Sequence, residues 1–201
     1  MISVIDYDGG NCKSVINILN RLNLKFFFTN DEQEILKSER IILPGVSNFK
    51  YCIDSLKKKN LDKILYENVL IKKKKILGIC SGMQILGTYS EEGNVDGLNI
   101  IKGFIKKIPN NKTLKVPHMG WNKIDTSNNN LFNNIKNYTR FYFCHSYHFV
   151  PDHEEIIINY TNYNIKICAA YNFKNIYGVQ FHPEKSFLDG FKLVKNFCEN
   201  C

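Results

Sequence analysis

The amino-acid sequence predicts an α/β fold with a mostly parallel central sheet flanked by helices. Short apolar runs lack the polar alternation of half-exposed strands, which indicates strands buried on both faces of a sheet. Segments with apolar residues at helical spacing lie between the early runs, and strands that alternate with helices form parallel βαβ units. The chain has 201 residues, so we expect one domain spanning residues 1–201.

Five apolar runs are interpreted as strands because each ends abruptly at glycine, proline or a polar cluster. They are residues 2–6, 40–45, 75–80, 140–145 and 176–183. The stretch 100–171 is richer in strand-like segments and in Asn-rich turns such as 126–130. We therefore expect an additional antiparallel strand region there, packed on the same core.

Helices are expected between the early strands and at the end of the chain. The spacing i, i+3, i+4, i+7 marks one helix by Val15, Ile18, Leu19 and Leu22. A near repeat marks a second by Leu61, Ile64, Leu65 and Val69. Ser186 and Asp189 resemble a capping box that opens the last helix. That helix is predicted to bury Phe187, Phe191, Val194 and Cys198.

Composition and charge disfavour several classes of protein. The net charge of +8 is concentrated in lysine runs at 57–59 and 72–75, which are typical of solvated surfaces. No aromatic or arginine platform is interleaved with them, so nucleic-acid binding is not predicted. No apolar run reaches the length of a membrane span, and the first residues lack the features of a signal peptide. We expect a cytoplasmic protein.

The seven cysteines are interpreted as reduced thiols, because their number is odd and their spacing irregular. The final segment 198–201 has CxxC spacing, but neither a second pair nor a flanking histidine completes a zinc site. We interpret it as the tail of a helix, with metal binding as the alternative. No metal or cofactor is predicted.

The candidate nucleophile is Cys80, in the segment LGICSGMQILG. A strand that runs through Gly78 to Cys80 and Gly82, and then into a helix, describes a nucleophile elbow. The helix N-terminus favours the thiolate, and the backbone N–H of Ser81 points to where an oxyanion would form. The alternative is a small buried cysteine at the end of a strand.

His182 and Glu184 follow another apolar strand, in GVQFHPEKS. A histidine could take the thiol proton and a carboxylate could orient the imidazole, in the chain order Cys, His, Glu. Pro183 must bend the chain for the carboxylate to reach the ring. Taken singly, His182 could be a loop histidine bonded to backbone and Glu184 an acid at a helix start. Together with a cysteine elbow they favour catalysis.

These motifs carry a resemblance to a known family. PGV (44–46), GICSGMQ (78–84) and GVQFHPEKS (178–186) resemble the class I glutamine amidotransferases, whose cysteine hydrolyses glutamine through a thioester. A second group of motifs resembles the glutaminase subunits of imidazole glycerol phosphate synthase, in histidine biosynthesis: DYDGGN, SEEG, KVPHMGWN and FCHSY. The resemblance runs nearly end to end and implies the flavodoxin-like fold of that class.

The resemblance also implies roles for single residues. Cys80 would be the nucleophile, His182 the general base and acid, and Glu184 the residue that orients His182. The substrate glutamine would be held by Gln84, Glu92, Ser146 and Tyr147, with Glu92 paired to its α-ammonium group. Without the resemblance, Glu92 would be interpreted as part of a solvated loop.

The segment PGVSNF (44–49) resembles the second oxyanion element of the family. It would supply a backbone N–H near Gly45 and Val46, beside that of Ser81. In the family this segment is poorly oriented until a partner and its ligand bind. Family members usually carry glycine at the position of Ser47, and serine narrows the accessible backbone conformations. They more often carry an apolar residue at position 81, where serine keeps the N–H and adds a hydroxyl that could cap the helix or tune the pocket.

A chain of this size that holds only amidotransferase motifs has no room for the chemistry of an ammonia acceptor. The resemblance implies a heterodimer with a (β/α)₈-barrel cyclase. In the family, the tryptophan of HMGWN, here Trp121, lies near the ammonia exit, and Lys185 and Asn11 map to the interface. Each of the three could also be an ordinary surface residue.

Three other functions fit parts of the sequence. A paralogous glutaminase could supply ammonia for amidino groups on nucleotide-activated sugars in surface-polysaccharide synthesis. A non-catalytic binding subunit is disfavoured because Cys80, His182 and Glu184 are all present. A free-standing cysteine hydrolase would leave the HMGWN and PEKS elements unexplained. Glutamate release with and without the barrel cyclase separates these hypotheses.

Overall fold

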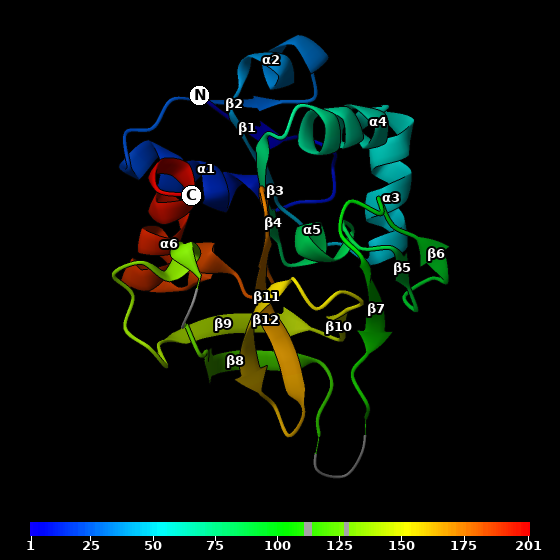
Figure 1. The fold of residues 1–201 in the computed structure, drawn as a ribbon, viewed down its shortest axis with the longest axis vertical. Coiled ribbons are helices and arrows are strands. Elements are labelled where there is room, and N and C mark those ends of the chain that lie inside the picture. The colour runs from blue at the N-terminus through cyan, green and yellow to red at the C-terminus, as the bar shows by residue number, and fades with distance from the viewer. Residues whose placement is uncertain (111–113, 127–128) are drawn as a thin grey trace.

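The centre of the molecule is a seven-stranded sheet in the order β11-β12-β13-β4-β3-β1-β2. The computed structural model describes residues 1–110, 114–126 and 129–201 (Figure 1). The parallel strands are β1 (Ile2–Ile5), β2 (Phe26–Thr29), β3 (Arg40–Leu43), β4 (Lys75–Ile79) and β13 (Ile176–Val179). The antiparallel strands are β12 (Lys166–Phe173) and β11 (Ile157–Asn162). The predicted fold class is confirmed.

Helices cover both faces of this sheet (Figure 1). One face carries α1 (Cys12–Arg21) and α6 (Phe187–Glu199), and the other carries α3 (Phe49–Lys58), α4 (Leu61–Tyr66) and α5 (Ser81–Gln84). A π-helical turn, Glu67–Ile71, continues α4, and the short α2 (Glu32–Lys37) follows β2. The predicted helical spacings hold, since α1 buries Val15, Ile18 and Leu19, and the α4 segment buries Leu61, Leu65 and Val69.

Two smaller sheets come from the middle of the chain. One has the order β10-β7-β5-β6, and the other pairs β8 with β9. Their strands are β5 (Tyr89–Ser90), β6 (Val95–Asp96), β7 (Gly103–Lys107), β8 (His118–Lys123), β9 (Arg140–His145) and β10 (Tyr147–Pro151). Two 3₁₀ turns, Asn130–Phe132 and Pro183–Lys185, complete the elements. The predicted turn at 126–130 includes residues 127 and 128, which lie outside the described ranges.

Three details of the predictions are wrong. The run 140–145 does form a strand, but β9 pairs with β8 and its burial alternates, with Phe141, Phe143 and His145 buried between more exposed residues. Ser186 does not cap α6, because its hydroxyl donates to His182 O at 2.6 Å and accepts from Tyr142 N. Phe187 is 78% exposed, because the turn before α6 places it with a φ of +49° at the surface.

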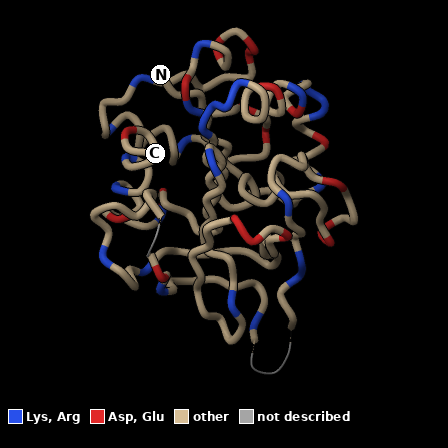
Figure 2. Tube along the Cα trace, in the orientation of Figure 1, with Lys and Arg blue, Asp and Glu red and all other residues tan. Residues whose placement is uncertain are grey.

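The positive charge is spread over the molecule (Figure 2). The lysine runs also serve the fold, because Lys74 Nζ donates to the carbonyls of Ile35 and Leu36 at 2.8 Å. Lys75 Nζ donates to Cys201 O. Among the described residues, no helix combines the length and the apolar character that a membrane crossing requires.

Arg40 connects β3 to the end of the chain, and its removal should destabilise the fold. Its Nε donates to Phe197 O at 3.0 Å and its Nη2 to Cys201 O at 3.1 Å. We expect Arg40→Ala to lower the free energy of unfolding by about 2 kcal/mol in urea titrations, because hydrogen bonds from a charged donor are lost. The exposed Arg140 is the matched control, and Arg140→Ala should change stability by less than about 0.5 kcal/mol. Equal effects of the two variants would contradict the anchoring role.

Candidate active site

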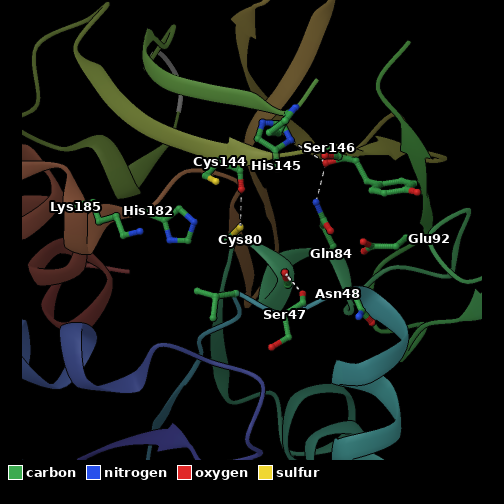
Figure 3. A pocket seen from close by; sticks show the side chains of 14 residues that line it. Ser47, Asn48, Cys80, Gln84, Glu92, Cys144, His145, Ser146, His182 and Lys185 are labelled. Atoms are coloured by element: carbon green, nitrogen blue, oxygen red, sulfur yellow. Dashed lines mark hydrogen bonds between the residues drawn. The ribbon is translucent and has the colours of Figure 1, made fainter. Parts of the chain in front are cut away.

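A pocket of about 340 Å³ opens where β3, β4 and β13 end (Figure 3). The carboxyl ends of parallel strands are the usual place for a ligand site in an open α/β sheet. Loops after each of these strands contribute to the lining, and further residues come from the smaller sheets. The lining residues are Val46, Ser47, Asn48, Cys80, Ser81, Gln84, Glu92, Pro117, Cys144, His145, Ser146, Tyr147, His182 and Lys185.

Cys80 forms a strained elbow between β4 and α5. Its φ of +53° is rare for a residue with a side chain and costs about 1–3 kcal/mol. Two glycines make the elbow fit. A Cβ atom at Gly78 would lie 2.6 Å from Gly82 O, and one at Gly82 would overlap the carbonyl oxygen of Leu43. The elbow turns the Cys80 thiol into the pocket and places Ser81 at the first position of α5, where its N–H has no acceptor within the helix (Figure 3).

His182 and Glu184 form a buried pair beside Cys80. His182 Nδ1 donates to Glu184 Oε1 at 2.7 Å, and the two side chains are 3% and 2% exposed. The 3₁₀ turn that begins at Pro183 bends the carboxylate back to the ring. Because a carboxylate only accepts, the proton of this bond sits on Nδ1. Nε2 is therefore the nitrogen available to Cys80, toward which the ring points (Figure 3).

The electrostatics of the pair favour a protonated ring. Burial alone would lower the pKa of His182, but hydrogen bonds and charge at Cys80 and Glu184 raise this pKa to about 10. The imidazole consequently holds protons on both nitrogens at neutral pH.

Gln84 lies in the wall of the pocket and is fixed by two hydrogen bonds. Its Nε2 donates to Tyr147 O and to Gln180 Oε1, both at 2.8 Å. With both amide protons engaged, its Oε1 is left as an acceptor. Gln180 is fully buried, and its own Nε2 lies 3.8 Å from Cys80 Sγ. The sequence interpretation missed Gln180, although it stands two residues before His182 in the same motif.

Glu92 and His182 lie at opposite ends of the pocket (Figure 3). Glu92 Oε2 accepts from Phe49 N at 2.8 Å, at the first residue of α3. Its own N–H donates to Ser90 Oγ at 3.0 Å. A carboxylate is therefore held in place at one end of the pocket and a thiol–imidazole pair at the other. Ser146 and Tyr147 line the wall between them.

A buried histidine pair, which the sequence did not reveal, supports this wall. His145 Nδ1 donates to Tyr147 O at 2.8 Å, so its Nε2 must accept from His118 Nδ1 at 2.9 Å. Asn122 Nδ2 lies 3.5 Å from His118 Nε2 and completes the chain of donors. Burial lowers the pKa of His118 to about 4, and burial together with His118 lowers the pKa of His145 to about 3. Both rings are neutral at physiological pH.

The predicted second oxyanion element has its amides turned away from Cys80. Val46 N donates to Gly9 O at 3.0 Å, and Ser47 N donates to the same oxygen at 3.3 Å. Gly45 packs so closely on α5 that a Cβ atom there would overlap Gly82 N. Of the three predicted donor positions, Val46 has its N–H bonded to Gly9 O, whereas neither Gly45 N nor Ser81 N has a backbone acceptor among the described contacts.

The residues predicted for a partner interface lie outside the pocket or at its rim. Trp121 is 43% exposed and stacks on Phe187, with ring centroids 5.1 Å apart. Lys185 lines the pocket, and its Nζ lies 5.6 Å above the ring of Tyr142. Asn11 lies before α1, where its Nδ2 donates to Ser14 Oγ at 3.0 Å, and it does not line the pocket. Met119 and Leu188 add exposed apolar surface.

No group of ligands suited to a metal ion occurs among the described residues. The seven cysteines are free thiols, and Cys198 and Cys201 are both buried. Burial raises the pKa of Cys198 to about 12 and that of Cys201 to about 11, which keeps both thiols protonated. The CxxC segment therefore forms the end of α6 and the two residues that follow it, and both of its cysteines pack into the core.

Comparisons with known proteins cover almost the whole chain. A protein of Pseudomonas aeruginosa named imidazole glycerol phosphate synthase subunit HisH 2 is 42% identical over 200 residues, which cover 99% of each chain. A Methanococcus maripaludis protein of the same name is 41% identical over 98% of each chain. Subunit HisH of Leptospira borgpetersenii is 40% identical over 98% of each chain.

Solved structures share the fold at low sequence identity. A glutamine amidotransferase superposes with a TM-score of 0.76 at 13% identity, over 98% of this chain and 97% of that one. PurLQS from Thermotoga maritima gives a TM-score of 0.70 at 18% identity, over 98% and 96%. The family model described as glutamine amidotransferase class-I matches residues 3–201. The chain belongs to the class I glutamine amidotransferases.

Proposed function

We propose that this chain is the glutaminase subunit of an imidazole glycerol phosphate synthase. It hydrolyses glutamine to glutamate and passes the ammonia to a (β/α)₈-barrel cyclase, in histidine biosynthesis in the cytoplasm. One observation carries the proposal: a strained cysteine faces a carboxylate-bound, protonated histidine in a pocket whose far end holds a second carboxylate, Glu92. The relatives named as HisH subunits support the pathway.

The first half of the reaction forms a thioester. The Cys80 thiolate attacks the side-chain amide carbon of glutamine, and a carbon–sulfur bond forms. The negative charge that develops on the amide oxygen is stabilised by the backbone N–H of Ser81. His182 Nε2 gives its proton to the amide nitrogen, the carbon–nitrogen bond breaks, and ammonia leaves. Glu184 holds the ring by its Nδ1 proton throughout.

The second half releases glutamate. His182, now neutral at Nε2, takes a proton from water, and the oxygen attacks the thioester carbon. The carbon–sulfur bond breaks, the sulfur leaves as a thiolate, and the imidazolium is restored. The raised pKa of His182 suits this cycle because the ring returns to its protonated state after each turnover.

Substrate binding is assigned to the opposite end of the pocket. The carboxylate of Glu92 pairs with the α-ammonium of glutamine, and the Gln84 Oε1 acceptor and the Ser146–Tyr147 wall complete the contact. Glu92 Oε2 already accepts from Phe49 N, so its position is set before substrate arrives. The length of the pocket then fixes which carbon of the substrate meets Cys80.

The partner is assigned to the face around the pocket rim. Lys185 is both exposed and part of the lining, and Trp121 with Phe187 forms an exposed aromatic stack near it. Exposed aromatic surface of this kind is typical of protein interfaces. Asn11 contributes from the start of α1. The cyclase subunit is proposed to cover this face and to receive ammonia through it.

The partner proposal is tested by glutamate release from the purified chain, alone and with the barrel cyclase and its ribotide ligand. We expect at least about tenfold stimulation of kcat, because a gated subunit should not waste glutamine. A tenfold change in kcat corresponds to about 1.4 kcal/mol of activation free energy, which partner binding can supply. An equal rate with and without the cyclase would rule out the histidine-pathway assignment. It would leave the sugar-amidination hypothesis to be tested with its own acceptor enzyme.

Replacement of Glu92 should weaken glutamine binding more than turnover. We expect Glu92→Gln to raise KM for glutamine by about 10- to 100-fold with little change in kcat, because one charge-assisted contact is lost. The amide still accepts from Phe49 N. Glu91→Gln is the matched control. Glu91 is exposed, and among the described residues its side chain accepts from Lys107 N and lies outside the pocket lining. A similar rise in KM for both variants would argue against the ammonium contact.

Replacement of Glu184 should change the pH dependence of catalysis. Burial lowers the pKa of His182, but the hydrogen bonds and charges of Cys80 and Glu184 together raise it to about 10, so the imidazolium persists until pH approaches that value. Glu184→Gln removes the negative charge, lowers that pKa, and should move the alkaline fall of kcat/KM to lower pH. We also expect kcat to decrease by about 10²- to 10⁴-fold, because the ring loses its orienting acceptor. The measurement is a pH–rate profile of glutamate release, and an unchanged alkaline limb would contradict the assigned role.

A further inference from the structure

The segment after β3, residues 45–49, is held against its surroundings by a small set of hydrogen bonds. Gly9 O accepts from Val46 N and Ser47 N, at 3.0 and 3.3 Å. The Ser47 carbonyl accepts from Ser81 Oγ at 2.7 Å (Figure 3). These contacts tie the segment to the loop before α1 on one side and to the nucleophile elbow on the other.

This arrangement keeps two backbone N–H groups of the segment away from the oxyanion position. Val46 and Ser47 both line the pocket, but their N–H groups are aimed at Gly9 O rather than at the space beside Cys80. The Ser81 N–H alone stands at the position that the elbow predicts. Loss of one oxyanion donor lowers kcat by about 10²- to 10³-fold in enzymes where it has been removed. A rotation that aimed one of these N–H groups at the space beside Cys80 would add an oxyanion donor and raise kcat.

The Ser81 hydroxyl opposes that rotation. It does not cap α5, because the N-cap position is Cys80 and no side-chain cap bond forms. Ser81 is 8% exposed, so water competes little for its bond to Ser47 O. The other donor to this carbonyl, Cys52 Sγ at 3.7 Å, is a thiol and a weak one. Among the described residues, removal of the hydroxyl would leave the carbonyl with that thiol as its only donor.

We propose that the Ser81 hydroxyl is a positioning group that holds segment 45–49 with its amides turned away from Cys80, and so lowers the glutaminase rate of the chain alone. This inference rests on the proposed function and adds a regulatory residue to the same site. Val46 is 51% exposed at the pocket rim, where a docked partner can press on the segment and break the Ser81–Ser47 bond. Partner binding then exchanges one hydrogen bond for a second oxyanion donor.

The test compares Ser81→Ala with the wild type, each alone and with the barrel cyclase and its ribotide ligand. Alanine keeps the backbone N–H and removes only the hydroxyl. We expect kcat of the isolated chain to rise by about two- to tenfold, the range that one net hydrogen bond corresponds to, with KM little changed. The kcat of the activated complex should stay the same, so the stimulation factor falls by the same ratio.

Ser38→Ala is the matched control. Ser38 is 2% exposed, its Oγ donates to Ile35 O at 2.8 Å, and it lies just after α2, outside the pocket lining. This variant loses a comparable buried hydroxyl and should lower stability without a change in either kcat. A rate increase in Ser38→Ala as well would mean that general loosening, and not the Ser81 bond, raises the rate.

Amide hydrogen exchange gives a second readout that needs no partner. Exchange at Val46 and Ser47 should accelerate by about two- to tenfold in Ser81→Ala and remain unchanged in Ser38→Ala. An isolated Ser81→Ala chain with the wild-type kcat, or with no rate above that of Cys80→Ala, overturns the inference even if the cyclase stimulates the wild type. If the cyclase stimulates neither protein but Ser81→Ala alone is faster than wild type, the inference stands and the pathway assignment fails.

Discussion

The site depends on a backbone contact between the start of α5 and the end of β3. Gly82 lies so close to the Leu43 carbonyl oxygen that no side chain fits there, and a side chain at Gly45 would overlap the Gly82 nitrogen. Because α5 begins pressed against β3, the chain leaving β4 must turn at once, and Cys80 takes the strained conformation that exposes its sulfur. The same contact brings the Ser81 hydroxyl under segment 45–49. Nucleophile, oxyanion donor and the bond to Ser47 thus follow from one close approach.

Two histidines of the same pocket differ in charge because their hydrogen-bond partners differ. His182 donates to a carboxylate, and the negative groups beside it raise its pKa to about 10 despite burial. His145 donates to the Tyr147 carbonyl, a neutral dipole, so burial dominates and lowers its pKa to about 3. The protein therefore keeps a proton carrier next to the sulfur. It also keeps a rigid, uncharged support behind the substrate wall, although the side chain is the same.

The sequence predicted the parts of the fold and site that depend on local pattern. Buried runs, helical spacing and the GxCxG and HPE motifs lie in contiguous residues, so each could be read without knowledge of its neighbours in space. It missed β2, whose FFFT run is short and half-exposed, and it missed the alternating burial of β9. The pairing of His118 with His145 and the place of Gln180 depend on strand register, which no single motif contains. Ser186 was misassigned because its hydroxyl serves the turn at His182 rather than the helix that follows.

The hydrogen bonds of the His118–His145 pair all run in one donor-to-acceptor direction. Asn122 donates to His118, His118 donates to His145, and His145 donates to the Tyr147 carbonyl, which also accepts from Gln84. A backbone carbonyl can only accept, so neither ring can exchange its tautomer unless the other exchanges too and the final bond is lost. This row of hydrogen bonds has a single low-energy arrangement of donors and acceptors, so the two rings have negligible freedom to change tautomer. The same ordered row of hydrogen bonds therefore connects β8, which carries Trp121 at the surface, with the wall of the glutamine pocket.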